Sequence, residues 1–387
     1  MLQRIYFDAN AGAPLLPAAC DAAVAALHAM ANASSVHTEG RRARAAVEAA
    51  RAEVAGAVNG NPENVIFTSG ATEAVALALT PRIVSGAAPR PAGRLYVGAT
   101  EHPCVLVGGR FAPSKVTVLP VERSGVVDLA ALERALAEHD VSDGVPCVAL
   151  MLANNETGVI HPVAAAARLA KARGGYVFCD AVQALGRIPV DIGALGVDFL
   201  AISSHKIGGP QGAGALVLAD EAVHPEPLLT GGGQERRRRA GTENVTSIVG
   251  FGVAARLARH HLPDMGRVAA LRAKMEAGIT AVAPEAKIIG ADAERLPNTT
   301  LFAVPGLSAE TAVIAFDLEG IAVSAGSACS SGKVARSHVL QAMEEPGGVG
   351  QSGIRVSLTN TADMAQVEAF VVTWRAIHAR MRQVKAA

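Results

Sequence analysis

The chain has 387 residues, with 35 basic and 35 acidic side chains and a formal net charge of zero. This balance provides no electrostatic attraction to nucleic acid or to an anionic membrane, so we expect neither as a partner. Apolar residues make up 50% of the chain and aromatic residues only 3%, which predicts an aliphatic core. The length exceeds what one hydrophobic core usually supports, so two structural domains are expected.

We expect residues 1–12 to form a short strand and turn rather than a signal sequence. Residues 1–12 contain no apolar run behind a basic start, which favours a cytoplasmic protein. The most apolar later stretch, residues 248–258, is too short and too rich in glycine to span a bilayer. The five cysteines show no metal-binding or disulfide spacing, so we expect no metal site: they are Cys20, Cys104, Cys147, Cys179 and Cys329.

Short apolar runs alternate with helical patterns through the first part of the chain. The expected strands are residues 65–68, 94–97, 116–119, 147–152, 176–179, 199–203 and 213–218, and the expected helices between them include residues 129–139 and 163–173. This alternation predicts an α/β fold with a mostly parallel sheet. Ligands bind at the carboxyl ends of the strands in such sheets, so the polar residues found there are expected to meet in one crevice.

A change of pattern after about residue 260 predicts a second, smaller domain. The new pattern consists of a long helix, strands around residues 299–304 and 322–324, and a final helix from residue 362. We expect a large domain of residues 15–258 and a small domain formed by residues 1–14 with residues 259–387.

The most informative segment runs from Ser203 to Pro210 and follows a predicted buried strand. It places Lys206 on a tight polar turn, beside His205 and ahead of two glycines. A Schiff-base lysine must be uncharged near neutral pH, and lysine shifts its pKa readily when desolvated. Most lysines simply face solvent, but this setting indicates a lysine that binds pyridoxal phosphate.

Two further features suit the same cofactor. Asp180 ends an apolar strand, where a poorly solvated carboxylate requires a cationic partner such as a pyridinium nitrogen. Residues 68–73 lead from a strand into a helix, whose first N–H groups can bind phosphate together with Ser203 and His205. Without the lysine, this segment would be interpreted as an ordinary helix cap. The glycines of residues 209–214 lead into a strand, so a dinucleotide fingerprint is not indicated.

Two side chains outside these segments are candidates for catalysis and substrate binding. His102 follows a predicted strand and is either a packed loop histidine or an imidazole that stacks on the cofactor and moves protons. Arg355 lies within a strand and needs an anionic partner if it is buried. A substrate carboxylate bound by two N–H groups would satisfy that need.

The glycines at residues 231–233 and the four arginines from Arg236 to Arg239 allow two interpretations. The glycines are either a flexible connector or part of an ordered functional loop that extends to residue 244. The arginines are either a solvated face or a docking surface for an acidic partner.

One cysteine differs in its surroundings from the other four. Cys329 lies in a run of small residues, 324–331, which cannot build a core and predicts an exposed loop. The cysteines of the apolar strands are expected to behave as small hydrophobic residues. Cys104, two residues after His102, is the one rival as a reactive thiol.

Together these motifs resemble the cysteine desulfurases, enzymes that remove sulfur from cysteine and carry it as a protein persulfide. The resemblance extends over almost the whole chain and rests on residues 6–11, 32–37, 68–73, 101–102, 154–158, 180–183, 203–210, 232–244, Cys329 and 337–340. It implies a fold-type I pyridoxal phosphate transferase that acts as a homodimer. A seven-stranded, mostly parallel sheet would form the large domain, and a smaller α+β domain would carry the Cys329 loop.

The resemblance also implies roles for individual residues around the cofactor ring. Lys206 would hold the pyridoxal 5′-phosphate, His102 would stack on its ring, and Asp180 would face the pyridine nitrogen. Asn155 and Gln183 would bond near the ring oxygen.

The remaining implied roles concern the phosphate and the substrate. The phosphate would be bound by Ala71, Thr72, Ser203, His205 and, from the neighbouring subunit, Thr242. Asn32 and Arg355 would bind the carboxylate of the substrate L-cysteine, and Cys329 would take up its sulfur.

The implied reaction converts L-cysteine to L-alanine and forms a persulfide on Cys329. The spacing from Cys329 to Ser337 is similar to that of the long-loop desulfurases, so an iron–sulfur scaffold or another sulfur-acceptor protein is the expected partner. One alternative is another pyridoxal phosphate enzyme of the same fold, such as a selenocysteine lyase or an aminotransferase. Another is a docking protein that passes sulfur between partners without generating it.

Overall fold

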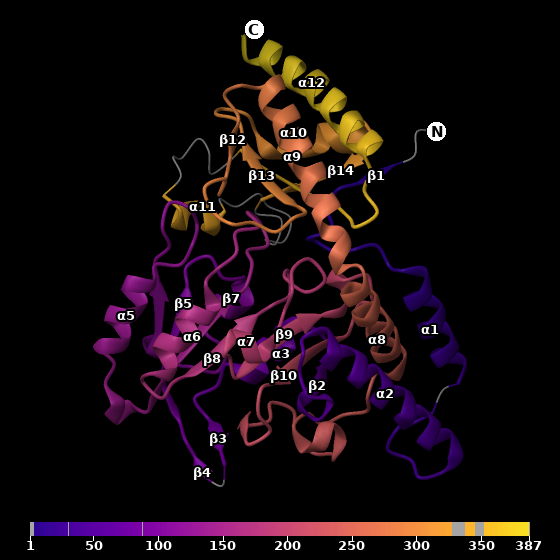
Figure 1. Ribbon diagram of the computed structural model, residues 1–387, viewed down its shortest axis with the longest axis vertical. Helices are drawn as coiled ribbons and strands as arrows, with labels where there is room; N and C mark the ends of the chain where they lie inside the picture. Colours follow the sequence, from indigo (N-terminus) through magenta and orange to yellow (C-terminus); the bar gives the residue numbers. More distant parts are fainter. Residues whose placement is uncertain (1–3, 30, 87, 327–336, 345–351, 387) are drawn as a thin grey trace.

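The computed structural model describes residues 4–386 except residues 30, 87, 327–336 and 345–351. Figure 1 shows a lower part built around a large sheet and an upper part that contains both the N-terminal strand and the C-terminal helix. None of the helices within the described ranges is both long and apolar enough to cross a membrane.

A seven-stranded sheet lies at the centre of the lower part, in the order β2-β10-β9-β8-β7-β5-β6. Its strands are β2 (Val65–Thr68), β5 (Ala92–Gly98), β6 (Val116–Leu119), β7 (Val145–Met151), β8 (Tyr176–Asp180), β9 (Phe199–Ser203) and β10 (Gly214–Leu218). Only β10 runs against its neighbours, and the other six strands share one direction. The predicted fold class, with a seven-stranded and mostly parallel sheet, is confirmed.

Apolar residues on both faces of this sheet explain why its strands are continuous apolar runs. Along β8, Val177 and Cys179 face one core, whereas Tyr176 and Phe178 face the other. Helices α2 (Thr38–Ala57), α5 (Leu129–Ala137), α6 (Val163–Lys171), α7 (Ile192–Leu195) and α8 (Val245–His260) cover the first face. Helices α3 (Ala71–Ala78) and α4 (Pro103–Leu106) cover the second.

Three smaller features complete the lower part. Helix α1 (Pro17–His28) packs against α8. A three-stranded sheet is formed by β3 (Ile83–Ser85), β4 (Ala88–Pro89) and β11 (Val223–Pro225). The predicted helices 129–139 and 163–173 each end two residues early, at Ala137 and Lys171. The second of these ends ahead of Gly174, which has a left-handed φ of 67° that favours glycine.

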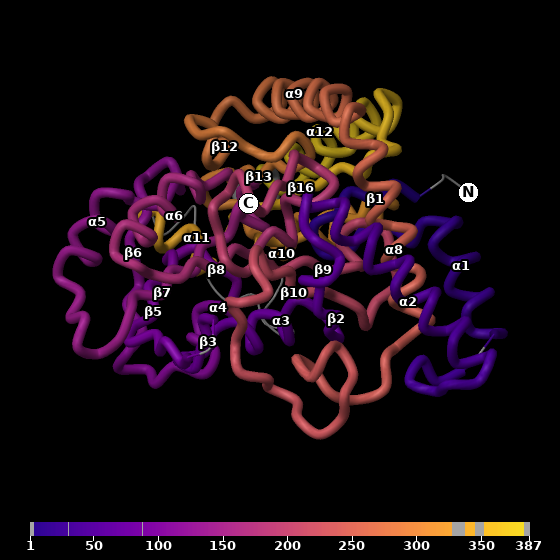
Figure 2. The backbone as a smooth tube through the Cα atoms, turned by 60° about the horizontal axis from the view of Figure 1, so that its bottom comes forward, coloured from indigo at the N-terminus to yellow at the C-terminus, as the bar shows by residue number. Residues whose placement is uncertain are grey.

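The upper part has its own hydrophobic core. Helices α9 (Met265–Val282), α10 (Ala309–Leu318) and α12 (Met364–Ala386) pack on a four-stranded sheet of β12 (Lys287–Ile288), β13 (Thr299–Ala303), β16 (Gly353–Ser357) and β15 (Ser324–Ala325). Helix α11 (His338–Ala342) lies beside this sheet, and β1 (Ile5–Tyr6) pairs with β14 (Ile321–Ala322). In Figure 2, α9 and α12 form the layer farthest from the large sheet.

Phe7 belongs to the core of the upper part, although it lies near the start of the chain. It packs against Phe370 of α12, with 6.1 Å between ring centroids. This contact joins Phe7 to the upper part of the molecule. The predicted boundaries at residues 15 and 258 stay a prediction.

The loop from residue 231 to 244 is ordered by two ion pairs. Arg51 of α2 donates two hydrogen bonds of 2.8 Å to the buried Glu235, which also accepts from the backbone N–H of Phe67. Arg239 forms a second bidentate pair with Glu73 of α3. The loop therefore forms part of the large domain rather than a flexible connector.

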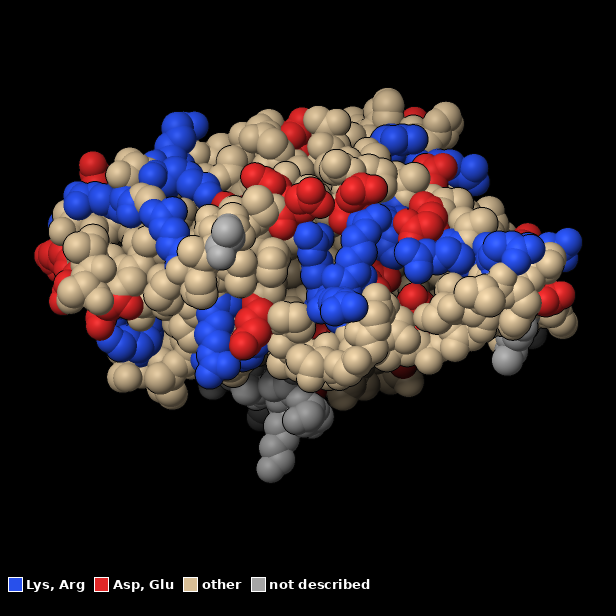
Figure 3. Space-filling model, turned by 90° about the horizontal axis from the view of Figure 1, so that it is seen from below, with Lys and Arg blue, Asp and Glu red and all other residues tan. Residues whose placement is uncertain are grey.

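Most of the arginine run is bound to the same chain. Arg236 and Arg238 donate to the carbonyl of Glu63, in addition to the pairing of Arg239 described above. Figure 3, which views the molecule from below, shows basic and acidic side chains interspersed over that surface. These contacts favour the solvated-face interpretation over a basic docking surface.

Three consecutive residues of this loop have left-handed backbones. The φ angles of Glu235, Arg236 and Arg237 are 46°, 54° and 64°. The left-handed region costs a non-glycine residue about 1–2 kcal/mol. The ion pair between Arg51 and Glu235 therefore holds a strained turn in place.

We expect the substitution Arg237→Gly to stabilise the protein by about 0.5–1 kcal/mol, because glycine adopts a left-handed backbone without a steric penalty. Thermal unfolding in the presence of cofactor measures the effect. Arg134→Gly, within the exposed face of α5, is the matched control and is expected to destabilise by about 1 kcal/mol. Equal losses of stability in both variants would contradict the strained-turn interpretation.

Candidate active site

A cavity of about 580 Å³ lies at the carboxyl ends of the strands of the large sheet. Its walls come from both parts of the molecule and are formed by Asn10, Ala11, Ser69, Gly70, Ala71, Thr72, His102, Cys104, Met151, Ala153, Asn155, Asp180, Val182, Gln183, Ser203, His205, Lys206, Gln211, Gly212 and Arg355. The structure thus brings together every predicted site residue except Asn32, Thr242 and Cys329.

Lys206 lies in a single 3-10 turn, Ser204–Lys206, directly after β9. Its Nζ donates hydrogen bonds to the carbonyl oxygens of Asn10 at 2.6 Å and Ala11 at 2.8 Å. The N-terminal segment is in turn fixed to this turn, because the N–H of Ala13 donates to the carbonyl of His205. The amine therefore lies where the N-terminal segment crosses the end of the large sheet.

Asp180 is the last residue of β8 and is 6% exposed. Its Oδ1 accepts one hydrogen bond, from the N–H of Val182 at 2.9 Å. Burial raises the pKa of this carboxyl to about 6, while the hydrogen bond from Val182 and the positive charge of Lys206 act in the opposite direction. A cationic ring nitrogen in the cavity would supply the buried carboxylate with a charged partner.

The opposite end of the cavity suits an anion. The first N–H groups of α3, at Ala71 and Thr72, have no acceptor within the helix and lie at its positive end. Gly214 allows this approach, since a Cβ there would lie 2.6 Å from the carbonyl carbon of Gly70. The chain backbone can therefore form a phosphate cradle.

Two side chains complete this cradle. Ser203 Oγ lies 2.9 Å from Nδ1 of His205, and both residues line the cavity. Burial, together with the neighbouring charge of Lys206, lowers the pKa of His205 to about 4. The imidazole is therefore neutral near pH 7 and can donate one hydrogen bond to a phosphate while accepting another.

His102 is the N-cap residue of α4, and this position fixes its protonation. Its Nδ1 accepts the backbone N–H of Cys104 at 3.2 Å. The ring proton is therefore on Nε2, since an acceptor nitrogen carries no hydrogen. Burial lowers the pKa of His102, and the electrostatic effects of the neighbouring Lys206 and His338 lower it further. Near neutral pH, His102 offers an Nε2–H group to the cavity.

Cys104, the rival thiol, also lines this cavity, with its Sγ 2.9 Å from Nδ1 of His102. Burial raises the pKa of the Cys104 thiol to about 12. Because only the thiolate is a nucleophile, this environment does not support Cys104 as the reactive cysteine.

Arg355 of β16 is 2% exposed and already has an anionic partner. It donates to Oδ1 of Asp8 at 2.8 Å and to the carbonyl of Asn155 at 3.1 Å. Its Nε is buried and has no hydrogen-bond partner among the described residues. We expected the anionic partner of Arg355 to be a substrate carboxylate, but Asp8 already fills part of that role. The N–H groups of Arg355 without a partner among the described residues are left for a ligand.

Asn10 is a site residue that sequence reasoning missed. It is buried, its side chain donates to the carbonyl of Asn155 and to Thr299 Oγ1, and its carbonyl accepts from Lys206 and from Gln183. The segment that contains Asn10 supported the family resemblance, but a lone asparagine in a turn indicates no chemistry. Only the crossing of the N-terminal segment over the sheet reveals its contacts.

Three predicted residues do not line the cavity of this single chain. Asn32 is exposed between α1 and α2, where its Oδ1 accepts the N–H of Ser34. Thr242 is exposed in the loop that precedes α8. Cys329 lies outside the described residues. Their roles stay predictions.

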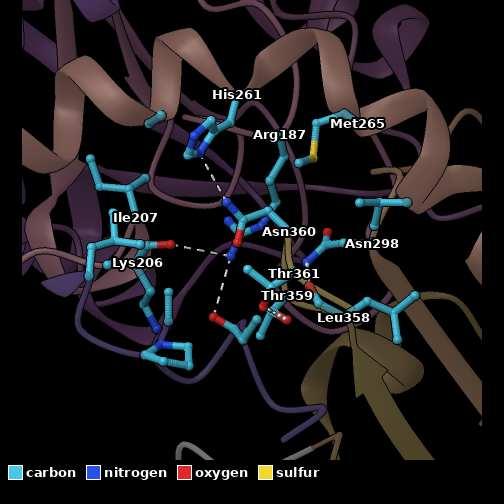
Figure 4. Close-up of a pocket in the computed structure, with 18 of the residues that line it drawn as sticks. Arg187, Lys206, Ile207, His261, Met265, Asn298, Leu358, Thr359, Asn360 and Thr361 are labelled. Carbon is cyan, nitrogen blue, oxygen red and sulfur yellow. Dashed lines mark hydrogen bonds between the residues drawn. The ribbon is translucent and has the colours of Figure 1, made fainter. Parts of the chain in front are cut away.

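A second cavity, of about 280 Å³, also contacts the Lys206 turn (Figure 4). Within it the buried Arg187 donates to the carbonyls of Gln183, Ala9 and Lys206, at 2.7, 3.3 and 3.4 Å. Lys206 is the only predicted site residue among those that line it. Arg187 therefore fixes the backbone beside the lysine, and the larger cavity is the candidate active site.

Comparison with known proteins assigns the family. Residues 5–370 match the family described as aminotransferase class-V. A cysteine desulfurase of Enterobacter agglomerans is 38% identical over 384 residues, which cover 98% of this chain and 94% of that protein. The chain belongs to the class V aminotransferase family, among its cysteine desulfurases.

Other relatives of this desulfurase agree. An IscS-like cysteine desulfurase of Mycobacterium tuberculosis is 37% identical over 98% of this chain and 97% of its own length. The solved structure of a NifS-like protein from Rickettsia africae superposes with a TM-score of 0.86 at 33% identity, covering 97% of this chain and all of the other. The family and the enzyme class predicted from the motifs are confirmed.

The cavity fits the cofactor of this family, pyridoxal 5′-phosphate. Its anion cradle, its buried carboxylate at Asp180 and the amine of Lys206 match the phosphate, the ring nitrogen and the aldehyde. Gln183 has hydrogen-bonding capacity left for the ring, because its Oε1 is buried without a partner among the described residues.

Replacing Asp180 with asparagine is expected to have opposite effects on the cofactor-free and cofactor-loaded proteins. A pKa raised from 3.8 to about 6 means that the ionised carboxylate destabilises the folded cofactor-free protein above pH 6 and not below pH 3.8. Asp180→Asn should therefore stabilise the cofactor-free protein by about 1–3 kcal/mol at pH 7.5, and this gain should disappear as the pH falls toward 4.

Thermal unfolding across this pH range measures the first effect, and cofactor titration measures the second. The variant should bind pyridoxal phosphate more weakly, because the ring nitrogen loses its ion pair. Asp21→Asn, at an exposed carboxylate of α1, is the control and should change neither quantity. A cofactor-free Asp180→Asn protein that is less stable than the wild type at pH 7.5 would contradict this account.

Proposed function

We propose that this enzyme converts L-cysteine to L-alanine and transfers the sulfur to Cys329 as a persulfide, with pyridoxal 5′-phosphate held at Lys206. The observation that carries the proposal is the convergence of Lys206, Asp180 and His102 with the amino end of α3 in one cavity. When bound, pyridoxal phosphate supplies an electron sink for the substrate carbon next to it.

Binding of the cofactor is divided among three groups of this chain. Asp180 holds the protonated ring nitrogen by an ion pair, and the amino end of α3 holds the phosphate with Ser203 and His205. Lys206 is the third group. Its amine lies beside the carbonyls of Asn10 and Ala11 and, once uncharged and released from the cofactor, would be able to take a proton from the substrate.

Two residues orient the substrate and the protons. Arg355 binds the cysteine carboxylate through the N–H groups that Asp8 and the carbonyl of Asn155 do not occupy. His102 works through Nε2 only, because Nδ1 is bound to the backbone of Cys104. This arrangement leaves Lys206 as the better base and His102 as a hydrogen-bond donor.

The sulfur step needs no external oxidant. The Cys329 thiolate attacks the substrate sulfur, a sulfur–sulfur bond forms, and the carbon–sulfur bond breaks with its electron pair left on carbon. That carbon takes up a proton, so the products are alanine and one persulfide on the enzyme. Cys329 must be deprotonated to begin this step.

We also propose a homodimer in the cytoplasm that passes sulfur to an iron–sulfur scaffold or another acceptor protein. The exposed positions of Thr242 and Asn32 agree with their contributing to a neighbouring subunit rather than to their own. Separate hydrophobic cores support a large domain of residues 15–258 and a small domain of residues 1–14 with 259–387.

Substituting the two candidate thiols separately tests the proposal. Cys329→Ser should keep the visible absorbance of the bound cofactor but lose alanine and sulfide formation from L-cysteine by at least about 100-fold, since the nucleophile is absent. Cys104→Ser, the matched control inside the cavity, should stay within a few-fold of the wild type. An aminotransferase would keep its turnover in Cys329→Ser.

Lys206→Ala separates an enzyme from a docking protein. The variant should lose both the cofactor absorbance and alanine formation. If sulfur transfer to Cys329 continued without Lys206, the protein would be a sulfur relay and the proposed function would be wrong. If Cys329→Ser retained activity on selenocysteine alone, the enzyme would be a selenocysteine lyase.

A further inference from the structure

Arg355 joins the candidate active site to an acidic residue that does not line it. The buried guanidinium lies in the cavity wall, whereas Asp8 is not among the residues that form that wall. One hydrogen bond of 2.8 Å runs from Nη2 of Arg355 to Oδ1 of Asp8, and another of 3.1 Å runs from Nη1 to the carbonyl of Asn155. A guanidinium has five N–H groups, so three remain for a ligand, the buried Nε–H among them.

The backbone of Asp8 is fixed at the end of β16. Asp8 forms a parallel bridge with Ser357 of that strand, two residues after Arg355. The N–H of Ser357 donates to the carbonyl of Phe7 at 2.8 Å, and the N–H of Ala9 donates to the carbonyl of Ser357 at 3.1 Å. Hydrogen bonds on both sides of Asp8 therefore hold its carboxylate beside the guanidinium and restrict the directions in which that group can point.

A second buried arginine makes the surroundings of Arg355 more positive. Arg187, labelled in Figure 4, is 7% exposed and donates to backbone carbonyls. Burial, together with the neighbouring charge of Arg355, lowers the pKa of Arg187 to about 10, so it is still cationic near pH 7. Among the described residues, Asp8 is the only acidic side chain in an ion pair with either arginine, and the nearby Glu156 accepts from Ser337 instead. Two buried cations with one paired carboxylate favour an anionic ligand.

Asp8 acts on a bound carboxylate in two opposing ways. Its hydrogen bond aligns the guanidinium of Arg355 for a two-pronged contact. Its negative charge repels a second carboxylate on the same guanidinium, because like charges at close range disfavour one another. The substrate L-cysteine and the product L-alanine carry the same carboxylate, so this repulsion lowers the affinity for both. Weaker binding of the product speeds its release.

We propose that Asp8 is a positioning residue that orients Arg355 and reduces its affinity for carboxylates, so that the site releases L-alanine after each turnover. This inference rests on the proposed function, because it takes Arg355 as the site of the substrate carboxylate. A purely structural ion pair would support Arg355 without limiting how tightly the site holds a carboxylate.

Titration of the cofactor-loaded enzyme with L-alanine measures the effect without turnover, through the change in visible absorbance of the bound cofactor. Asp8→Asn keeps an acceptor oxygen for Arg355 but removes the charge. We expect this variant to bind L-alanine at least about fivefold more tightly than the wild type, because the repulsion between two carboxylates is removed. L-Alaninamide, which lacks the carboxylate, should bind equally well to both proteins.

Two further variants separate the charge of Asp8 from its shape. Asp8→Glu keeps the charge and should bind L-alanine within about twofold of the wild type. Asp8→Ser is neutral and smaller. It should also bind L-alanine more tightly than the wild type, by a smaller factor because the orienting contact is weakened, and it provides the same comparison if Asp8→Asn does not fold.

Steady-state kinetics give the second readout. In Asp8→Asn, KM for L-cysteine should fall about fivefold, and L-alanine should inhibit at correspondingly lower concentrations, while kcat does not exceed that of the wild type. If Asp8 served only to orient Arg355, its replacement would instead raise KM.

Glu276→Gln is the matched control for loss of a buried ion pair. Glu276 pairs with Arg295 at 2.8 Å in the upper part of the molecule, and the side chains of Arg295 and Glu276 are 6% and 17% exposed, against 2% and 18% for Arg355 and Asp8. Both Glu276→Gln and Asp8→Asn should lower the stability, but Glu276→Gln should leave L-alanine affinity within about twofold of the wild type. Tighter L-alanine binding by Glu276→Gln or Asp8→Glu, or unchanged or weaker binding by Asp8→Asn, would overturn the inference.

The outcome also distinguishes failure of this inference from failure of the proposed function. If the wild type formed neither alanine nor a persulfide from L-cysteine, the proposed function would be wrong, although the L-alanine titration would still measure the effect of Asp8. If the wild type formed both and Asp8→Asn bound L-alanine no more tightly, only the role of Asp8 would be wrong.

Discussion

Burial of ionisable groups at one edge of the large sheet is the constraint on which the rest of the structure depends. Six strands share a direction, so their carboxyl ends deliver Asp180, Lys206 and His102 to the same place. A buried carboxylate and the unpaired N–H groups of a helix end both cost free energy unless a partner satisfies them. A phosphate ester with a basic ring nitrogen would supply both partners.

The N-terminal segment links this edge to the small domain. Phe7 packs in the upper core. Three residues later, the carbonyl of Asn10 accepts a hydrogen bond from Lys206, and the side chain of Asn10 donates one to Thr299 of β13. Asp8, between them, pairs with Arg355. Lys206 and Arg355 thus both contact the same short segment, so the position of one side chain is linked to that of the other.

The sequence predicted the large sheet well because its strands are apolar runs bounded by turn residues, as in Val65–Thr68 and Phe199–Ser203. Lys206, Asp180 and the start of α3 were predictable for a related reason, since each directly follows such a strand. The contact between Asp8 and Arg355 joins residues 347 positions apart, and no local pattern indicates it. Strands of two residues, such as β1 and β14, are too short to show a period. Thr242 and Asn32 are exposed and lie outside the cavity of this chain, so their predicted roles have no local contact that would have indicated them.

The location of the transferred sulfur tests the central claim most directly. The cofactor-loaded enzyme is mixed with one equivalent of L-cysteine in the absence of reductant, and its peptides are mapped by mass spectrometry while alanine is quantified. The account predicts a mass increase of one sulfur atom on the peptide that contains Cys329, in proportion to the alanine released. Alanine formation with the added sulfur on Cys104, or on no cysteine, would contradict it.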